Sequence, residues 1–234
     1  MNPIATKIFL ASIAGSILGL DRVFMQIMLS RPVVSAPLIG LMLGDAYTGL
    51  IVGAALELFW IDRLPIGTYL PPNDFLVAVL MASSAIIAGQ ELGHTSRELV
   101  ALSALIFIPF GYLGQKLDGF IIRSNDALSR KALEDAKEAN VTGIFRKHMA
   151  GLGKVFLGNF IFIFFPLLAG TILLIHIFPL LSPAFASTLT LTYFSLPLLG
   201  IAAGMNTINL KGAIPIFCVV FLTVSILLEL IHVF

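Results

Sequence analysis

Long apolar runs separated by short polar segments dominate the chain, and this pattern predicts membrane helices. A bilayer core about 30 Å thick requires about 20 residues of helix. We expect six runs to span the membrane: Ile4–Leu20, Phe75–Gly89, Leu99–Leu113, Val155–Phe178, Phe185–Gly204 and Ala213–Val233. Two of these runs are short, so we expect their helices to extend into the polar flanks.

One apolar stretch, from Ser30 to Asp74, is broken where a simple span would be continuous. Its two runs, Val33–Leu43 and Ala46–Ile61, meet at Gly44-Asp45. The first run has a helical length of about 16 Å, which is too short to cross a bilayer. The pattern predicts a re-entrant helical hairpin or a pair of tilted half-helices, with both ends on one side.

Composition makes a membrane protein the only reasonable class. Of 234 residues, 58% are hydrophobic and 12% are charged, and the mean hydropathy is +1.01. Soluble domains contain about 45–50% apolar and about 25% charged residues. The net charge of +1 gives no reason to expect a nucleic-acid partner. The single cysteine, Cys218, excludes a disulfide within the chain and a cysteine-based metal site.

Basic residues predict the orientation of the spans. The long polar segment 115–154 is rich in Lys and Arg, so the positive-inside rule places it in the cytoplasm. Counted outward from there, all Lys and Arg residues except Lys7 and Arg97 fall on the cytoplasmic face. We therefore expect an all-α integral membrane protein of six spans plus the broken unit, with both termini outside.

The same segment divides the chain. We expect an N-terminal membrane half at 1–114, with the broken unit at 31–74, and a C-terminal membrane half at 155–234. The cytoplasmic linker 115–154 joins them. Within it, Asn125–Ala139 has a weak apolar stripe and predicts an amphipathic helix capped by Asn125. A solvated connector and a docking surface are both open interpretations of this helix.

Glu57 is the first candidate for chemistry, because it lies inside an apolar run. A carboxylate in a membrane segment is costly and usually serves a function or has a partner. A structural hydrogen bond to a neighbouring helix is the alternative. Asn73 and Asp74 follow Pro71-Pro72 at the start of a span. They could face a ligand from a rigid turn or cap the helix.

Asp21, Gln26 and Arg31 lie between the first span and the broken unit. They provide hydrogen-bond donors and acceptors beside an apolar environment, and solvated loop residues are the alternative. Asp45 is expected to cap the helix that begins near Ala46.

Several motifs of catalysis are missing from the sequence. It contains no G-x-x-x-x-G-K-[ST] and no H-E-x-x-H, and its four histidines are scattered. We expect no catalytic residue, no metal site and no cofactor. If the substrate is chemically changed, another polypeptide must supply the reacting group.

At this point the sequence resembles a known family. The segments RPVVSAPLIGLMLGD (Arg31–Asp45), PPND (Pro71–Asp74) and IIAGQ (Ile86–Gln90), and more loosely INLKGAIPIF (Ile208–Phe217), carry the likeness. They resemble the IIC subunit of the mannose–fructose–sorbose class of the bacterial phosphoenolpyruvate-dependent sugar phosphotransferase system. Some family members carry an acid at the position of Asn73, whereas here the acid is Asp74.

The resemblance implies a sugar-conducting subunit of the bacterial inner membrane that is not itself an enzyme. Its partners would be a IID membrane subunit, cytoplasmic IIA/IIB phosphocarriers, a hexose and the lipid bilayer, in an oligomer of IIC–IID units. The sugar contacts would fall on Glu57, on Asn73 or Asp74, and on Asp21, Gln26 and Arg31.

Two other functions fit the broken helices and the buried carboxylate. One is an ion-coupled secondary transporter that acts alone. The other is a membrane scaffold or sensor that has kept the fold but does not transport.

Overall fold

The computed structural model describes residues 3–63, 66–208, 215–216, 218–220 and 223, and every regular element in these ranges is helical. The helices are α1 Pro3–Gly19, α2 Pro32–Leu43, α3 Ala46–Phe59, α4 Asp74–Leu92, α5 Arg97–Phe107, α6 Phe110–Lys137, α7 Val141–Ile177 and α8 Pro183–Ile208. The short 3-10 helices η1 (Leu20–Arg22) and η2 (Phe178–Leu180) follow α1 and α7. The all-helical prediction is confirmed.

Within the described residues, four helices are long and apolar enough to cross a membrane, and the bent pair α5–α6 makes a fifth. They correspond to the first five predicted spans. The axes of α5 and α6 differ by 43°. Pro109 lies at this break, and proline interrupts a helix because it has no N–H to donate. The sixth predicted span, Ala213–Val233, falls almost entirely outside the described residues.

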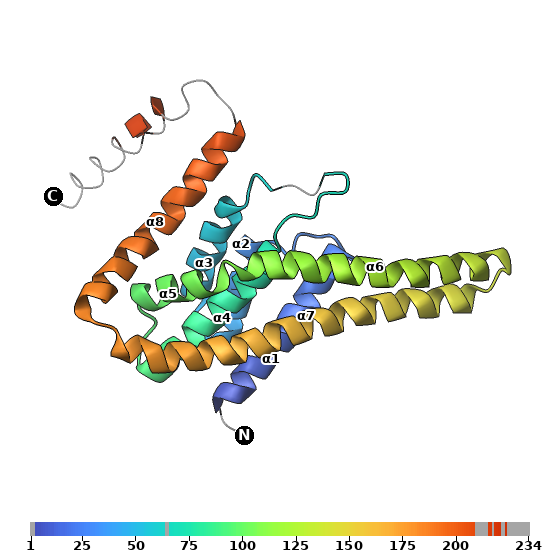
Figure 1. The fold of residues 1–234 in the computed structure, drawn as a ribbon, viewed down its shortest axis with the longest axis horizontal. Coiled ribbons are helices and arrows are strands. Elements are labelled where there is room, and N and C mark those ends of the chain that lie inside the picture. Colours follow the sequence, from blue (N-terminus) through green and yellow to red (C-terminus); the bar gives the residue numbers. More distant parts are fainter. Residues whose placement is uncertain (1–2, 64–65, 209–214, 217, 221–222, 224–234) are drawn as a thin grey trace.

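The helix α4 forms the centre of the bundle. It is buried on every side from Phe75 to Gly89, as expected for a helix that is apolar all round. Helices α1, α2, α3, α5, α6 and α7 pack against it (Figure 1). The helix α8 instead packs against α3 and α5 at the side of the bundle. The site described below is built around the first residues of α4.

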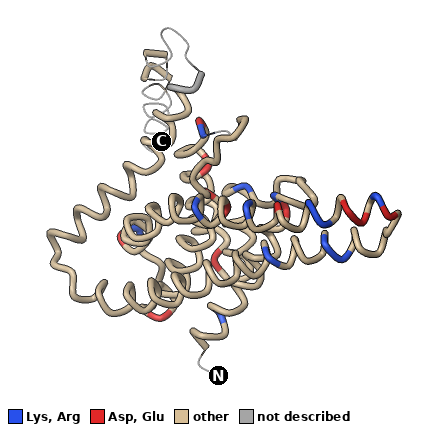
Figure 2. Tube along the Cα trace, turned by 45° about the vertical axis from the view of Figure 1, so that its right-hand side comes forward, with Lys and Arg blue, Asp and Glu red and all other residues tan. Residues whose placement is uncertain are grey.

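Helices α6 and α7 continue far beyond the bundle as an antiparallel pair (Figure 1). Their 28 and 37 residues give helical lengths of about 42 and 55 Å, both greater than the thickness of a bilayer core. We call the projecting part, residues 120–154, the arm. Charged residues are concentrated toward its tip (Figure 2). An ion pair between Asp135 and Lys147 joins the two helices there.

The predicted helix Asn125–Ala139 differs from the structure in its start. The helix α6 runs without interruption from Phe110 to Lys137, so Asn125 lies inside it and the predicted cap is wrong. No proline stands between Phe110 and Lys137 to stop the helix. Asn140 is the residue that caps a helix here, because its side chain accepts a hydrogen bond from Gly143 N at the start of α7.

Candidate functional site

The broken unit is an antiparallel helical hairpin whose turn is Gly44-Asp45. Gly44 adopts φ +90°, a left-handed conformation that glycine tolerates and that commonly ends helices. The Asp45 side chain accepts hydrogen bonds from Thr48 N at 2.9 Å and Thr48 Oγ1 at 2.6 Å. Asp45 therefore caps α3, as predicted.

Glycines hold the two short helices in close contact. Gly49 lies against the backbone of Ala36, and Gly53 lies against the backbone of Pro32. A Cβ at either glycine would collide with those backbone atoms. Small residues with this effect are typical of helix contacts in membranes. The close packing fixes the distance between the two free ends of the hairpin.

Glu57 bridges those free ends. Arg31 Nε lies 3.0 Å from Glu57 Oε1, and Val33 N donates to Glu57 Oε2 at 3.4 Å. The carboxylate therefore lies at the N-terminus of α2, where the helix dipole favours a negative charge. These contacts to Arg31 and Val33 N agree with the alternative interpretation, in which Glu57 forms a structural bond to a neighbouring helix. Its side chain nevertheless keeps 16% of its surface exposed.

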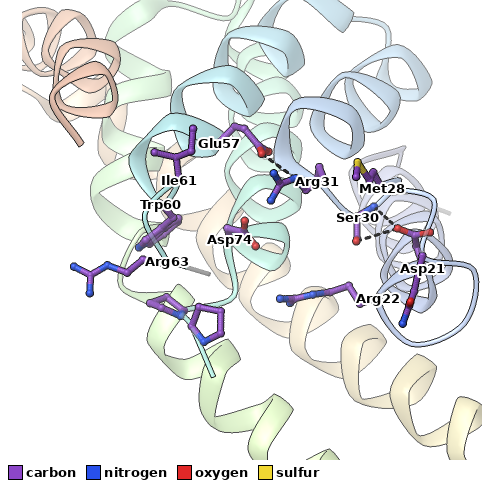
Figure 3. A pocket seen from close by; sticks show the side chains of 13 residues that line it. Asp21, Arg22, Met28, Ser30, Arg31, Glu57, Trp60, Ile61, Arg63 and Asp74 are labelled. Carbon is purple, nitrogen blue, oxygen red and sulfur yellow. Dashed lines mark hydrogen bonds and ion pairs between the residues drawn. The ribbon is translucent and has the colours of Figure 1, made fainter. Parts of the chain in front are cut away.

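A cavity of about 260 Å³ opens beside this ion pair (Figure 3). The end of α1, the free ends of the hairpin and the start of α4 surround it. It is lined by Asp21, Arg22, Gln26, Met28, Ser30, Arg31, Glu57, Trp60, Ile61, Arg63, Pro71, Pro72 and Asp74. Segments far apart in the sequence thus converge where the broken helices meet the central helix.

Asn73 and Asp74 have different roles. The buried Asn73 side chain accepts a hydrogen bond from Leu76 N at 3.0 Å and caps α4. Asp74 faces the cavity (Figure 3), and its Oδ1 accepts a hydrogen bond from Phe75 N at 2.8 Å. The rigid proline turn therefore directs Asp74, rather than Asn73, toward the cavity.

Asp21 organises the loop between α1 and α2. It is only 4% exposed, and its carboxylate accepts hydrogen bonds from Ile27 N at 2.8 Å and from Ser30 N and Oγ at 3.1 Å. Gln26 and Met28 have φ of +54° and +68°, a region that side-chain-bearing residues rarely adopt. Asp21 thus holds a strained loop in place at the cavity wall.

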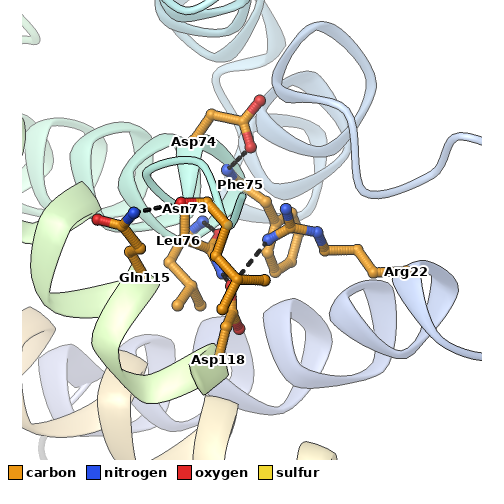
Figure 4. Close-up of polar contacts among 8 residues, drawn as sticks. Arg22, Asn73, Asp74, Phe75, Leu76, Gln115 and Asp118 are labelled. Carbon is orange, nitrogen blue, oxygen red and sulfur yellow. Dashed lines mark hydrogen bonds and ion pairs between the residues drawn. The ribbon is translucent and has the colours of Figure 1, made fainter. Parts of the chain in front are cut away.

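A second polar cluster joins α1, α4 and α6 behind the cavity (Figure 4). Asp118 Oδ2 accepts from Asn73 Nδ2 at 2.8 Å and lies 3.4 Å from Arg22 Nη1. Gln115 Nε2 donates to Leu70 O. Sequence reasoning missed Arg22 and Asp118. Asp118 falls in the segment predicted to be a solvated linker, and the only signal for it was a carboxylate beside Leu117 and Ile121 on a helix.

The cavity therefore gathers five of the six predicted residues: Asp21, Gln26, Arg31, Glu57 and Asp74. Asn73 lies behind it. Carboxylates accept hydrogen bonds and a guanidinium donates them, while Trp60 and the two prolines form an apolar wall. This combination suits a small neutral ligand rich in hydroxyl groups. Among the described residues, no group of three or more His, Cys, Asp or Glu side chains could hold a metal ion.

Comparison with protein families gives a match over nearly the whole chain. The family described as "PTS system sorbose-specific iic component" matches residues 5–233. A fructose permease IIC component of Bacillus subtilis is 30% identical over 146 residues, which are 62% of this chain and 51% of that protein. A putative N-acetylgalactosamine permease IIC component of Escherichia coli is 38% identical over 125 residues, 53% of this chain and 94% of that protein.

A mannose-specific EIIC component of Escherichia coli is 27% identical over 146 residues, 62% of this chain and 52% of that protein. The chain thus spans about half the length of its fructose and mannose relatives. A solved membrane protein structure has a TM-score of 0.72 at 23% identity and covers 97% of this chain and 92% of its own. A solved complex of the mannose transporter ManYZ with microcin E492 has a TM-score of 0.61, also at 23% identity, and covers 94% and 86%.

Proposed function

Because the chain belongs to the family of sorbose-specific IIC components of the phosphotransferase system, a family of multi-pass proteins of the bacterial inner membrane, we propose that it is a sugar-translocating subunit. It binds a hexose in the cavity at the free ends of the α2–α3 hairpin and passes it to a cytoplasmic IIB subunit for phosphorylation. The convergence of Glu57, Asp74 and Arg31 on that cavity carries the proposal.

The chemistry of the cavity supports a sugar ligand. Each carboxylate can accept hydrogen bonds from neighbouring hydroxyl groups, and such charge-assisted bonds are stronger than neutral ones. Trp60 and Pro71 supply an apolar surface for the C–H face of a pyranose ring. The volume of about 260 Å³ is close to the lower end of ligand pockets, about 300 Å³. This size suits a single monosaccharide.

Broken helices and a central site are features of transporters that expose a ligand alternately to the two sides. In our proposal the hairpin and the α1–α2 loop move relative to α4, so that the cavity opens to the cytoplasm. Phosphorylation by the partner then traps the sugar, because a charged sugar phosphate cannot cross lipid. The phosphoryl group travels on the IIA/IIB proteins and not on this chain.

The surface of the bundle supports a membrane partner as well as lipid. Large apolar side chains are exposed on α7 and α8, among them Leu157, Phe165 and Leu191. We propose that part of this surface contacts a IID subunit and that the rest faces lipid. The solved ManYZ transporter, whose fold this chain shares, supports a two-component assembly in the membrane. An oligomer of several IIC–IID units stays a prediction.

Glu57→Gln tests the site, because it removes the charge and keeps the shape. We expect uptake of radiolabelled hexoses by cells with the full IIA/IIB/IIC/IID set to fall to background. Each lost charged hydrogen bond is worth about 1.5–3 kcal/mol, or about 10- to 100-fold in affinity. The amount of protein in the membrane should not change, because an amide can still accept from Val33 N.

Glu91→Gln is the matched control. Glu91 is an exposed glutamate at the opposite end of α4 and does not line the cavity. Its uptake should equal that of the wild type. Normal uptake by Glu57→Gln would remove Glu57 from the site. Uptake by the wild type in vesicles without partner subunits or a phosphoryl donor would favour a stand-alone secondary transporter.

A further inference from the structure

A second cavity of about 260 Å³ lies next to the proposed sugar site, between α1, α4, α6 and α7. Arg22 lines both cavities. Figure 4 shows its side chain directed between Asp74, which faces the first cavity, and Asp118, which lines the second. The separation of 3.4 Å between Arg22 Nη1 and Asp118 Oδ2 is long for a charged hydrogen bond. Because Arg22 lines both cavities, a rotation of its side chain toward Asp74 would change the separation between them.

Asn159 gives the second cavity a polar group without a protein partner. The residue is 5% exposed and lines the cavity from α7. Among the described residues, no hydrogen bond to its amide is formed. Buried polar groups are nearly always hydrogen-bonded, because leaving one unpaired destabilises the fold. The Asn159 amide faces the cavity and is therefore available to a polar ligand there.

The other groups of the cavity define the chemistry of that ligand. Asn73 is held in place by its cap and by its bond to Asp118. Asp118 makes both of its contacts through Oδ2, which leaves Oδ1 available as an acceptor. The Phe75 ring forms an apolar wall. The charges of Arg22 and Asp118 offset each other in this cavity, so the remaining acceptor, the amide and the aromatic face together suit a neutral polyhydroxylated molecule.

The position of the second cavity indicates the direction in which a ligand would move through the protein. A third cavity, in the groove between the two arm helices, shares Val23 and Val155 with the second one. Asn125 lines this groove, and its Oδ1 is buried without a hydrogen-bond partner among the described residues. The three cavities therefore adjoin one another in a row that leads from the hairpin to the arm, the part predicted to lie in the cytoplasm.

We propose that the second cavity is a separate binding station for the sugar in transit, with Asn159 as its main hydrogen-bonding residue and Arg22 as the gate that divides it from the first. This inference rests on the proposed function. The sugar leaves Glu57 and Asp74, passes Arg22, and is held by Asn159 and Asp118 before it reaches the arm.

Asn159→Leu tests the station, because leucine is similar in size and has no polar atoms. In the assembled complex we expect the uptake rate of the tightest-binding labelled hexose to fall about 10-fold. Equilibrium binding of the same hexose, measured at concentrations that fill only the tighter first cavity, should stay within about 2-fold of the wild type. Thr171→Val is the matched control, because Thr171 is also buried on α7 and unpartnered among the described residues but does not line this cavity. Its uptake should not change.

Three outcomes of this comparison would overturn the proposal. They are a normal uptake rate in Asn159→Leu, a loss of uptake matched by an equal loss of binding, and an equal loss in Thr171→Val. The last outcome would assign Asn159 to helix packing.

Cysteine labelling gives a readout that does not depend on turnover or on the leucine variant folding. In a Cys218→Ser background, Ile121→Cys, which lines the same cavity and leaves Asn159 in place, should react with a small hydrophilic thiol reagent, and a saturating concentration of the hexose should protect it at least about 5-fold. Labelling that the hexose leaves unchanged, in a complex that still binds the hexose, would remove the second station alone. A complex that binds no hexose at all would instead remove the proposed function.

Discussion

The two ends of the α2–α3 hairpin carry similar polar residues, but these residues make shorter contacts at the closed end than at the free end. At the closed end, Asp45 accepts two hydrogen bonds from Thr48, and Gln90 Nε2 donates to Leu43 O at 2.5 Å. At the free end, Glu57 holds one side-chain partner, Arg31, and one backbone N–H at 3.4 Å. A cavity lies beside the free end.

The difference separates structural polar groups from groups available to a ligand. Asp45 and Glu57 each use two of the about four acceptor positions of a carboxylate, but both bonds of Asp45 are short and cap its own helix. Glu57 accepts from Val33 N at the longer distance of 3.4 Å, and its side chain lines a cavity. The same contrast holds within the cavity wall, where Asp21 is saturated by Ile27 and Ser30. Asp21 therefore positions the loop, while Glu57 and Asp74 are the groups that we expect to contact the sugar.

Replacing one glycine at each end of the hairpin with alanine should give the largest difference in sugar affinity between the two ends. A Cβ at Gly53 would collide with Pro32 O, one turn from Glu57, and a Cβ at Gly40 would lie 2.5 Å from Asp45 O at the turn. Overpacking of this kind destabilises by about 1–3 kcal/mol. We expect Gly53→Ala and Gly40→Ala to lower the thermal midpoint of the purified complex to a similar extent.

Only one of these two substitutions should weaken sugar binding. Gly53→Ala separates Arg31 from Glu57, so its affinity for the hexose should fall at least about 10-fold, whereas Gly40→Ala should bind within about 2-fold of the wild type. Equal losses of affinity at the two glycines would show that the hairpin acts as a single unit and that the contrast between its ends has no functional meaning.

The cap at the closed end should have an intermediate effect, confined to stability. Asp45→Ala leaves Thr48 N without its acceptor, and removal of an N-cap costs about 0.5–2 kcal/mol. Thermal unfolding in detergent should show this loss, and Asp45→Asn should restore most of it, because asparagine also caps well. Uptake per folded complex should stay unchanged. A fall in uptake that Asp45→Asn does not repair would assign the charge of Asp45 a role in transport.

Much of this organisation could be predicted from the hydrophobic pattern. The hairpin, its turn at Gly44-Asp45 and five membrane helices follow from the lengths of apolar runs and from the positions of glycine and proline. The polar residues around the hairpin also proved informative, because six of the twelve charged residues before residue 115 line one cavity. Their use in sugar binding stays a prediction.

The rest depends on contacts between distant segments. The choice of Asp74 over Asn73 as the exposed side chain is set by the direction of the first turn of α4, which the sequence alone does not give. Asp118 and Asn159 line one cavity only because α6 and α7 pack along each other. The polar composition of 115–154 predicted a cytoplasmic linker with a helix at Asn125–Ala139, but composition alone does not show that α6 runs through this segment without a break from Phe110.

The smallest expected effect concerns the contact that ties the closed end to α1. Lys7 Nζ donates to Gln90 Oε1 at 2.8 Å, and Gln90 in turn donates to Leu43 O. An exposed pair of this kind contributes about 0.5 kcal/mol or less, so Lys7→Met should leave the thermal midpoint and the uptake rate nearly unchanged. The closed end then remains fixed while the free end moves. A change in uptake rate of more than about 3-fold at unchanged stability would mean that the closed end also opens during transport, because only a contact that breaks in the cycle can alter the rate without altering the fold.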